Sequence, residues 1–233
     1  DVGAQFDVDG TGETRKVYYN GYKAGDDILD AGHEDEHEGG CCDHGPSFGA
    51  RRLGIENFAV KGMQGRGVLV DFVKHYGHGR TLIGHKELMS VMAADKVEVE
   101  PGDMLVLRTG FAETVMEMAG HPDGDALHKA GAVLNGADTD LLQWITDSGI
   151  AAICADNYAV EAYPALNAGK KKSLLPLHHH CLFKLGLPLA ELWYLRDLAE
   201  WLAANGRNRF LLTAPPLRLP GAVGSPVTPI ATV

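Results

Sequence analysis

The chain has 233 residues, 45% hydrophobic and 22% charged, which is ordinary for a folded globular protein and excludes an intrinsically disordered one. Its formal net charge of −10 argues against a nucleic-acid-binding protein, since the dense basic run at residues 170–172 has only three lysines and is typical of a solvated loop. No apolar run reaches the roughly eighteen residues that a membrane-spanning helix needs, so we expect no membrane span.

The first half of the chain predicts two buried strands around a helix. Residues 66–73 form a short apolar run after glycines, which is typical of a buried strand. Residues 85–94 place apolar side chains at helical spacing. Residues 104–107 predict a second buried strand, because the turn-forming sequence Pro-Gly-Asp at residues 101–103 leads into them.

The second half repeats this alternation. Asp138 begins a predicted helix that Gly149 ends, and the apolar run at residues 150–154 predicts a strand directly after it. Residues 195–205 predict another amphipathic helix, and residues 209–213 the strand that follows. Helices that alternate with fully apolar strands indicate an α/β fold whose sheet is buried on both faces.

We predict one domain over residues 1–233, because no internal repeat and no linker divides the chain. Residues 33–46 are very polar and predict a surface loop within residues 30–47. The loop contains histidines and cysteines, but their spacing matches no standard zinc module, so we predict no structural zinc site there.

The four cysteines favour a reducing compartment. Cys41 and Cys42 are adjacent and cannot easily pair with each other, and Cys154 lies in a strand-like run. Free thiols are therefore favoured over a disulfide framework, and we predict a cytoplasmic protein. A signal peptide stays open, because the sequence begins with Asp1 rather than Met.

The N-terminal segment holds the first cluster of candidate ligands. If residues 1–7 are extended, Asp1, Gln5 and Asp7 point to the same side and could converge on one cation. Oxygen donors of this kind suit Mg²⁺ or Mn²⁺ better than Zn²⁺. The alternative is a polar, glycine-rich turn without a metal.

The second cluster is the run of three histidines at residues 178–180, followed by Glu191. A histidine that faces a carboxylate is a base with an orienting partner, and imidazole is also a common metal ligand. The alternative is that these histidines only cap or line the start of a helix.

The order of several motifs resembles the cyclase and kynurenine formamidase (arylformamidase) family, in its long bacterial form, over nearly the whole chain. The most specific matches are Arg-Gly-Val-Leu-Val-Asp at residues 66–71 and Gly-Asp-Met-Leu-Val-Leu-Arg-Thr-Gly at residues 102–110. Further matches are Gln-Phe-Asp at 5–7, Tyr-Asn-Gly at 19–21, Leu-Gly-Ile-Glu at 53–56, Ala-Asp-Asn-Tyr-Ala-Val-Glu at 155–161, Pro-Leu-His at 176–178, Ala-Pro-Pro at 214–216 and Gly-Ala-Val-Gly-Ser-Pro-Val at 221–227.

This resemblance implies a swivelling β/β/α domain that assembles as a homodimer or homotetramer. It also implies hydrolysis of amide bonds, such as that of N-formylkynurenine or the lactam ring of isatin, with Zn²⁺ or Mn²⁺ as the cofactor. The expected partner is a small-molecule substrate. We therefore predict a metal-dependent hydrolase of amides or lactams; the alternative is a non-catalytic protein of the same fold that binds a small metabolite.

The family's metal signature is His-x-Gly-Thr-His-x-Asp, followed four residues later by a further His. The matching positions here include Asp1, Gln5, Asp7 and Thr11, so Asp7 is kept while the histidines are replaced. The resemblance implies that Asp1, Gln5 and Asp7 bind the metal. Thr11 stands where the family has its expected acid/base histidine.

The resemblance also implies that a later histidine and an acid complete the site. Glu191 matches the acid, and His178 fits the Pro-Leu-His pattern better than its neighbour does. We therefore predict His178 and Glu191 as catalytic residues and His179 as a further metal ligand. Phe6 and Tyr19 are candidates for substrate contact, although either could belong to the core.

Overall fold

The computed structural model describes residues 4–7, 14–29, 49–165 and 173–233. The predicted surface loop at residues 30–47 and the predicted ligand Asp1 lie outside these ranges. The chain divides into two compact units, the smaller made of residues 1–64 and 213–230 and the larger of residues 65–212 and 231–233. The prediction of a single domain over residues 1–233 stays a prediction.

The smaller unit consists of short elements. β1 pairs antiparallel with β2, placing Gln5 opposite Lys16 and Asp7 opposite Thr14, and β3 pairs antiparallel with β4. Its elements are β1 (Ala4–Asp7), β2 (Thr14–Val17), a 3₁₀ turn (Tyr19–Gly21), β3 (Ile28–Leu29), β4 (Gly49–Ala50) and α1 (Glu56–Lys61).

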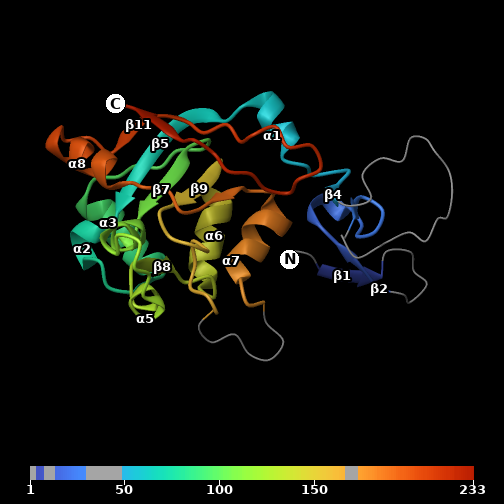
Figure 1. Cartoon of the computed structure of the whole chain (residues 1–233), viewed down its shortest axis with the longest axis horizontal. Helices are drawn as coiled ribbons and strands as arrows, with labels where there is room; N and C mark the ends of the chain where they lie inside the picture. Colours follow the sequence, from blue (N-terminus) through green and yellow to red (C-terminus); the bar gives the residue numbers. More distant parts are fainter. Residues whose placement is uncertain (1–3, 8–13, 30–48, 166–172) are drawn as a thin grey trace. The chain divides into compact units, whose positions relative to one another are not determined.

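The larger unit is built on a six-stranded sheet of order β10-β9-β7-β5-β11-β12, in which β10, β9, β7 and β5 run parallel (Figure 1). A separate parallel pair joins β6 to β8. The strands are β5 (Gln64–Asp71), β6 (Thr81–Ile83), β7 (Met104–Arg108), β8 (Ala132–Leu134), β9 (Ala152–Ala155), β10 (Leu189–Ala190), β11 (Arg209–Thr213) and β12 (Ile230–Thr232).

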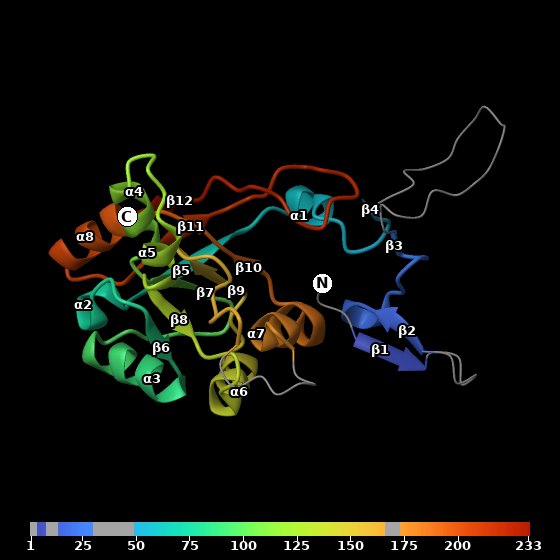
Figure 2. The same ribbon diagram turned by 60° about the horizontal axis from the view of Figure 1, so that its bottom comes forward.

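Helices cover both faces of this sheet, with α3 and α6 on one face and α8 on the other (Figure 2). The helices are α2 (Val73–Tyr76), α3 (His85–Ala94), α4 (Phe111–Glu117), α5 (Gly124–His128), α6 (Thr139–Ser148), α7 (Pro176–His178), a π-helical segment (His179–Leu185) and α8 (Arg196–Ala204). This arrangement confirms the predicted α/β class.

Alternation along the strands produces the two buried faces. Val68 and Val70 of β5 join the core cluster with α3 and α6, while Leu69 between them is also buried but lies outside that cluster. The neighbouring strands repeat the pattern, because successive side chains of a strand point to opposite faces. The near-continuous apolar runs of the sequence therefore reflect a sheet covered on both sides.

Where the sequence contains clear capping residues, the predicted ends of a helix agree with the structure. Helix α6 is capped by the Asp138 carboxylate, which accepts hydrogen bonds from the backbone N–H groups of Asp140 and Leu141, and it ends at Gly149 with a φ of 66°. Only a residue without a Cβ adopts this left-handed conformation at low cost. Both boundary residues were predicted from the sequence.

Two further predictions concern the chain's chemistry and its environment. Cys154 and Cys181 are free and buried, as the sequence favoured. None of the helices within the described ranges is long and apolar enough to span a bilayer.

Candidate functional site

The candidate site lies just beyond the carboxyl ends of β9 and β10. Chain segments that leave a parallel sheet at this edge commonly form ligand sites. The backbone N–H of Leu192, after β10, donates to the Asn157 carbonyl at 3.0 Å, and that of Trp193 donates to the Ala155 carbonyl at 3.2 Å. These bonds hold Glu191 beside the residues that follow β9.

His178 reaches the same place from helix α7, which is a single turn. Pro176 occupies its first position, where its missing N–H and fixed φ are tolerated. The Glu161 carboxylate caps the turn, since Oε2 accepts from the Leu177 N–H at 3.0 Å and Oε1 from the His178 N–H at 2.9 Å. A carboxylate from another part of the chain therefore anchors the turn that carries the histidine.

The imidazole ring of His178 lies between two carboxylates. Its Nδ1 is 2.9 Å from Glu161 Oε1, and its Nε2 is 3.3 Å from Glu191 Oε1. The Glu161 side chain is fully buried, that of His178 is 14% exposed, and that of Glu191 is 32% exposed. The row thus runs from the protein interior to solvent, and Glu191 is the member that an outside molecule reaches first.

The two carboxylates set the protonation of the ring. Loss of solvent around His178 would lower its pKa, but the hydrogen bonds and charges of Glu161 and Glu191 outweigh this effect and raise the pKa to about 9. Burial would raise the pKa of Glu191, yet the hydrogen bonds from His178 and from the Ala159 backbone hold it below its usual value. At neutral pH the pair is therefore an imidazolium beside a carboxylate.

The backbone around the site is strained. Ala159, Val160 and Leu192 have φ values of 68°, 53° and 59°, in the left-handed region that non-glycine residues rarely adopt. Ala159 and Val160 lie just before Glu161, and Leu192 lies just after Glu191. Strain of this kind commonly gathers at functional sites, where the surrounding structure enforces it.

The predicted histidines separate in the structure. His179 faces away to stack on Phe183, with ring centroids 5.1 Å apart and an interplanar angle of 17°. It also lines a cavity of about 240 Å³ together with Gly136, Leu142 and Pro176. His180 Nε2 lies 2.8 Å from the Thr146 hydroxyl. Of the three, His178 is the one that meets the predicted acid, Glu191.

The structure does not test the predicted metal ligands. Gln5 and Asp7 are placed only as backbone in β1, Asp1 lies outside the described ranges, and the His179 ring stacks on Phe183. Within the described parts of the chain, no group of three His, Cys, Asp or Glu side chains is arranged to hold a metal ion. The four metal ligands therefore stay predictions.

The predicted substrate contacts also stay predictions. Phe6 lies in β1, opposite Arg15. Tyr19 opens the 3₁₀ turn of the smaller unit and is 39% exposed, so it is not a core residue.

Glu161 is the functional candidate that the sequence did not reveal. It closes the motif Ala-Asp-Asn-Tyr-Ala-Val-Glu at residues 155–161, which was noted only as a family resemblance. A carboxylate after an apolar strand and an Asp-Asn pair is a signal for this edge of a parallel sheet, but the partner His178 lies 17 residues away. No local pattern links the two.

A separate ion-pair network follows β5 and β7. Arg108 Nη1 lies 2.9 Å from Asp71 Oδ2, its Nε lies 2.7 Å from Glu113 Oε1, and Glu113 also faces His78 Nε2 at 2.9 Å. Each charged group here faces an opposite or titratable partner, which is typical of a structural cluster.

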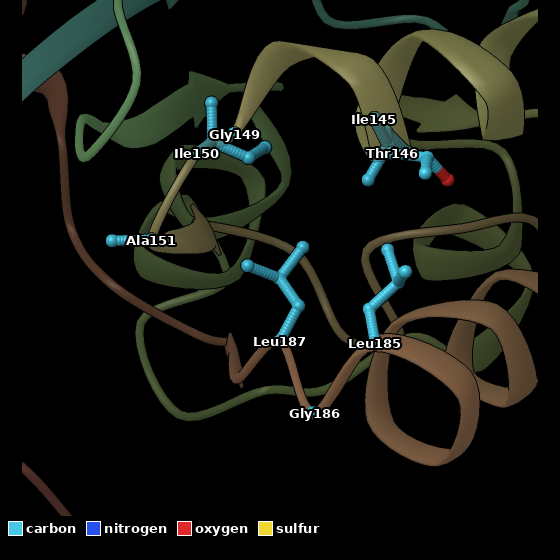
Figure 3. A pocket seen from close by; sticks show the side chains of 8 residues that line it. All are labelled: Ile145, Thr146, Gly149, Ile150, Ala151, Leu185, Gly186 and Leu187. Atoms are coloured by element: carbon cyan, nitrogen blue, oxygen red, sulfur yellow. The ribbon is translucent and has the colours of Figure 1, made fainter.

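A further cavity of the larger unit is lined mainly by apolar side chains. It measures about 300 Å³ and lies between the end of α6 and the segment after the π-helical turn, lined by Ile145, Ile150, Leu185 and Leu187 among others (Figure 3). The side chains drawn there include a single polar one, Thr146. Its side chains could therefore contact an apolar group, but they include no acid, base or metal ligand.

Comparison with known proteins places these features in a family. The sequence matches the family model described as "Putative cyclase" over residues 31–162, more than half of the chain. Glu161 lies within the match, whereas His178 and Glu191 lie beyond it. No curated protein matches the sequence.

Comparison with solved structures also finds a cyclase. A crystal structure described as a novel cyclase is 32% identical, with a TM-score of 0.72 over 93% of this chain and 64% of that protein. Isatin hydrolase A from Labrenzia aggregata is 13% identical, with a TM-score of 0.53 over 76% and 64% of the two chains. Isatin hydrolase A from Ralstonia solanacearum is 14% identical, with a TM-score of 0.55 over 76% and 63%.

These similarities support different conclusions. The isatin hydrolases are distant in sequence and show the fold alone. The chain spans 63–64% of the length of these three proteins.

Proposed function

This chain belongs to the cyclase family, and from that membership we propose that it hydrolyses a carbon–nitrogen bond of an amide or a lactam. The observation that carries the proposal is the ring of His178, held between Glu161 and Glu191 at the carboxyl edge of the parallel strands. A base that takes a proton from water and an acid that protonates the leaving nitrogen both speed such a hydrolysis. The fold shared with isatin hydrolases supports the choice of bond.

Glu191 and His178 can divide the proton transfers between them. The Glu191 carboxylate takes a proton from water as the water oxygen bonds to the carbonyl carbon. His178 then donates the proton on Nε2 to the leaving nitrogen as the C–N bond breaks. The products are a carboxylic acid and an amine, or one ring-opened amino acid from a lactam. Passage of a proton from Glu191 to His178 across the 3.3 Å between them restores the starting state.

The described residues form only part of a divalent-cation site. The Glu191 carboxylate is a ligand type that suits Zn²⁺ and Mn²⁺, but His178 Nε2 carries a proton in the proposed reaction and cannot bind a metal ion at the same time. From the family resemblance we keep as a proposal that Asp1, Gln5, Asp7 and His179 bind a cation. When bound, the cation would polarise the carbonyl group and stabilise charge on its oxygen.

The direct test is turnover of a panel of neutral amides. The purified chain is expected to open isatin-like lactams to a single ring-opened amino acid, or to deformylate N-formyl-aryl amides with formate and the aryl amine formed in equal amounts. Tight binding of these compounds without turnover would overturn the proposal and favour a non-catalytic, metabolite-binding protein. A small-molecule substrate, a homodimer or homotetramer and a cytoplasmic location all stay predictions.

The rate is expected to persist into alkaline pH. His178 must carry its proton to act as the acid, so kcat/KM should stay level through neutral pH and fall as the pH rises through about 9. The acid limb should lie below the usual pKa of glutamate, because the pKa of Glu191 is lowered. A decline centred near 6.5, the ordinary histidine value, would contradict this assignment. The measurement is kcat/KM from mildly acidic to alkaline pH.

Stability should follow the same ionisation. Because the pKa of His178 is raised in the folded chain from 6.5 to about 9, its ion pairs contribute fully below 6.5. That contribution is lost as the pH rises through about 9.

Removal of divalent cations is expected to lower the rate, and added Mn²⁺ or Zn²⁺ to restore it. Asp7→Ala should hold less metal than the native chain, whereas Asp9→Ala is a matched control, since Asp9 lies outside the signature positions. Elemental analysis and initial rates check both statements. An unchanged rate after complete removal of metal would exclude a catalytic cation.

A further inference from the structure

Glu161 is a buried carboxylate that takes no part in the proton transfers described above. We propose that Glu161 is a positioning residue, which fixes the imidazole of His178 so that Nε2 faces Glu191. The proposal deepens the proposed function and rests on it for the catalytic consequence. Its structural part concerns the orientation of one ring and stands independently.

A single carboxylate controls both the backbone and the ring of His178. Oε1 of Glu161 lies 2.9 Å from the backbone nitrogen and 2.9 Å from Nδ1. An ionised carboxylate only accepts hydrogen bonds, so Nδ1 must be the protonated donor. Nε2 is then the nitrogen that faces outward and exchanges its proton, which is the arrangement required of an acid or base at that position.

Glu161 itself has little freedom to move. Its backbone lies in a parallel bridge to Leu134 at the end of β8, and the flanking Ala162 N–H donates to the Leu134 carbonyl at 2.9 Å. A Cβ at Gly136 would lie 1.9 Å from Glu161 Oε2, so a residue without a side chain leaves the space that the carboxylate fills. The carboxylate is therefore fixed from the strand, the glycine and the helical turn together.

The ring needs this support because its other contact is weak. Nε2 lies 3.3 Å from Glu191 Oε1, longer than a typical charge-assisted hydrogen bond. Helix α7 continues directly into the π-helical segment, which holds the backbone of His178, whereas the direction of its ring depends on the two side-chain contacts. Without the Nδ1 bond, the ring would rotate and Nε2 would leave Glu191.

The test combines kinetics with the nitrogen NMR spectrum of the histidine rings. In the native chain we expect His178 Nδ1 to carry a proton shifted strongly downfield and protected from exchange. In Glu161→Gln the neutral amide oxygen accepts more weakly than a carboxylate does, so we expect this signal to move upfield and to lose its protection, and kcat to fall about 10- to 100-fold, the range for carboxylates that orient a functional histidine from behind. KM should change much less, because Glu161 does not touch the substrate.

Asp156→Asn is the matched control for burial and capping. Asp156 is 1% exposed, as Glu161 is, and it accepts from the backbone N–H groups of Thr109 and Gly110 at 2.7 and 2.9 Å. Its replacement should weaken the fold in a similar way but leave the Nδ1 signal of His178 in place. The same change of that signal in both variants would reduce Glu161 to a structural residue and overturn the proposal.

The outcomes separate the two proposals. An unprotonated Nδ1 in the native chain, or native kcat in Glu161→Gln, would overturn the role of Glu161 and leave the hydrolase proposal standing. A bonded Nδ1 whose hydrogen bond the variant weakens, in a chain that cleaves no amide, would support the positioning role and reject the hydrolase. If Glu161→Gln does not fold, the native spectrum alone decides.

Discussion

Replacement of His178 by asparagine is expected to lower kcat by about 10²- to 10⁴-fold with little loss of stability. The asparagine amide nitrogen can take the place of Nδ1 and still donate a hydrogen bond to Glu161. In the native chain Nδ1 lies 2.9 Å from Glu161 Oε1. The variant has no counterpart of Nε2, which faces Glu191. It therefore removes the acid and keeps the buried carboxylate paired. Initial rates and thermal unfolding measure the two effects.

His180→Asn is the control for this change. It alters a histidine two positions away, whose ring contacts the Thr146 hydroxyl at 2.8 Å instead of a carboxylate. Its rate should equal that of the native chain. If His178→Asn kept most of its activity, proton donation by His178 would be excluded and the proposed reaction would need another acid.

Gly136→Ala is expected to destabilise the chain by about 1–3 kcal/mol or more, the usual cost of an overfilled core. The added Cβ would lie 1.9 Å from Glu161 Oε2 and 2.9 Å from the Leu177 backbone nitrogen. The carboxylate cannot move aside cheaply, because it is buried and accepts three hydrogen bonds. Denaturant unfolding of native and variant chains gives the difference.

Gly124→Ala is the matched substitution for comparison. Gly124 opens helix α5, and a Cβ there meets nothing within 4 Å. Its free energy of unfolding should stay within about 0.5 kcal/mol of the native value. Equal unfolding of Gly136→Ala and Gly124→Ala would show that the space beside Glu161 is not tightly filled.

The elements with strong local signals were predictable from the sequence. Helix α3 spans the predicted residues 85–94, and α6 begins and ends at the predicted capping residues. Strand β7 extends one residue beyond the predicted 104–107, and β11 covers the predicted 209–213. In each case, caps, turns or apolar periodicity determine the boundary locally.

Other elements have no such local signal. Strands β6 and β8 have three residues each, which is too short for an alternation of apolar and polar residues to be recognised. They form because they pair with each other. Helix α7 is a single turn whose cap is the distant Glu161 rather than a neighbouring side chain. Tertiary contacts decide such segments, so the sequence could not predict them.

The candidate site was predictable to the same extent. The meeting of His178 with Glu191 follows from the family resemblance, and the structure bears out their proximity. The choice of His178 over His179 rested on one short motif, whereas the structure separates them by the direction of their rings. Glu161 could not be assigned from the sequence, because the role proposed for it depends on contact with His178, which lies 17 residues further along the chain.

The charges of Glu161, His178 and Glu191 also affect how substrate enters the site and how product leaves it. Without a bound cation, two carboxylates around one imidazolium leave an excess negative charge beside the reacting bond. An uncharged amide enters this field without electrostatic penalty, but hydrolysis turns it into an anion that the same field repels. For a chain that cleaves amides, the arrangement that carries the protons would thus also speed the departure of the acid product.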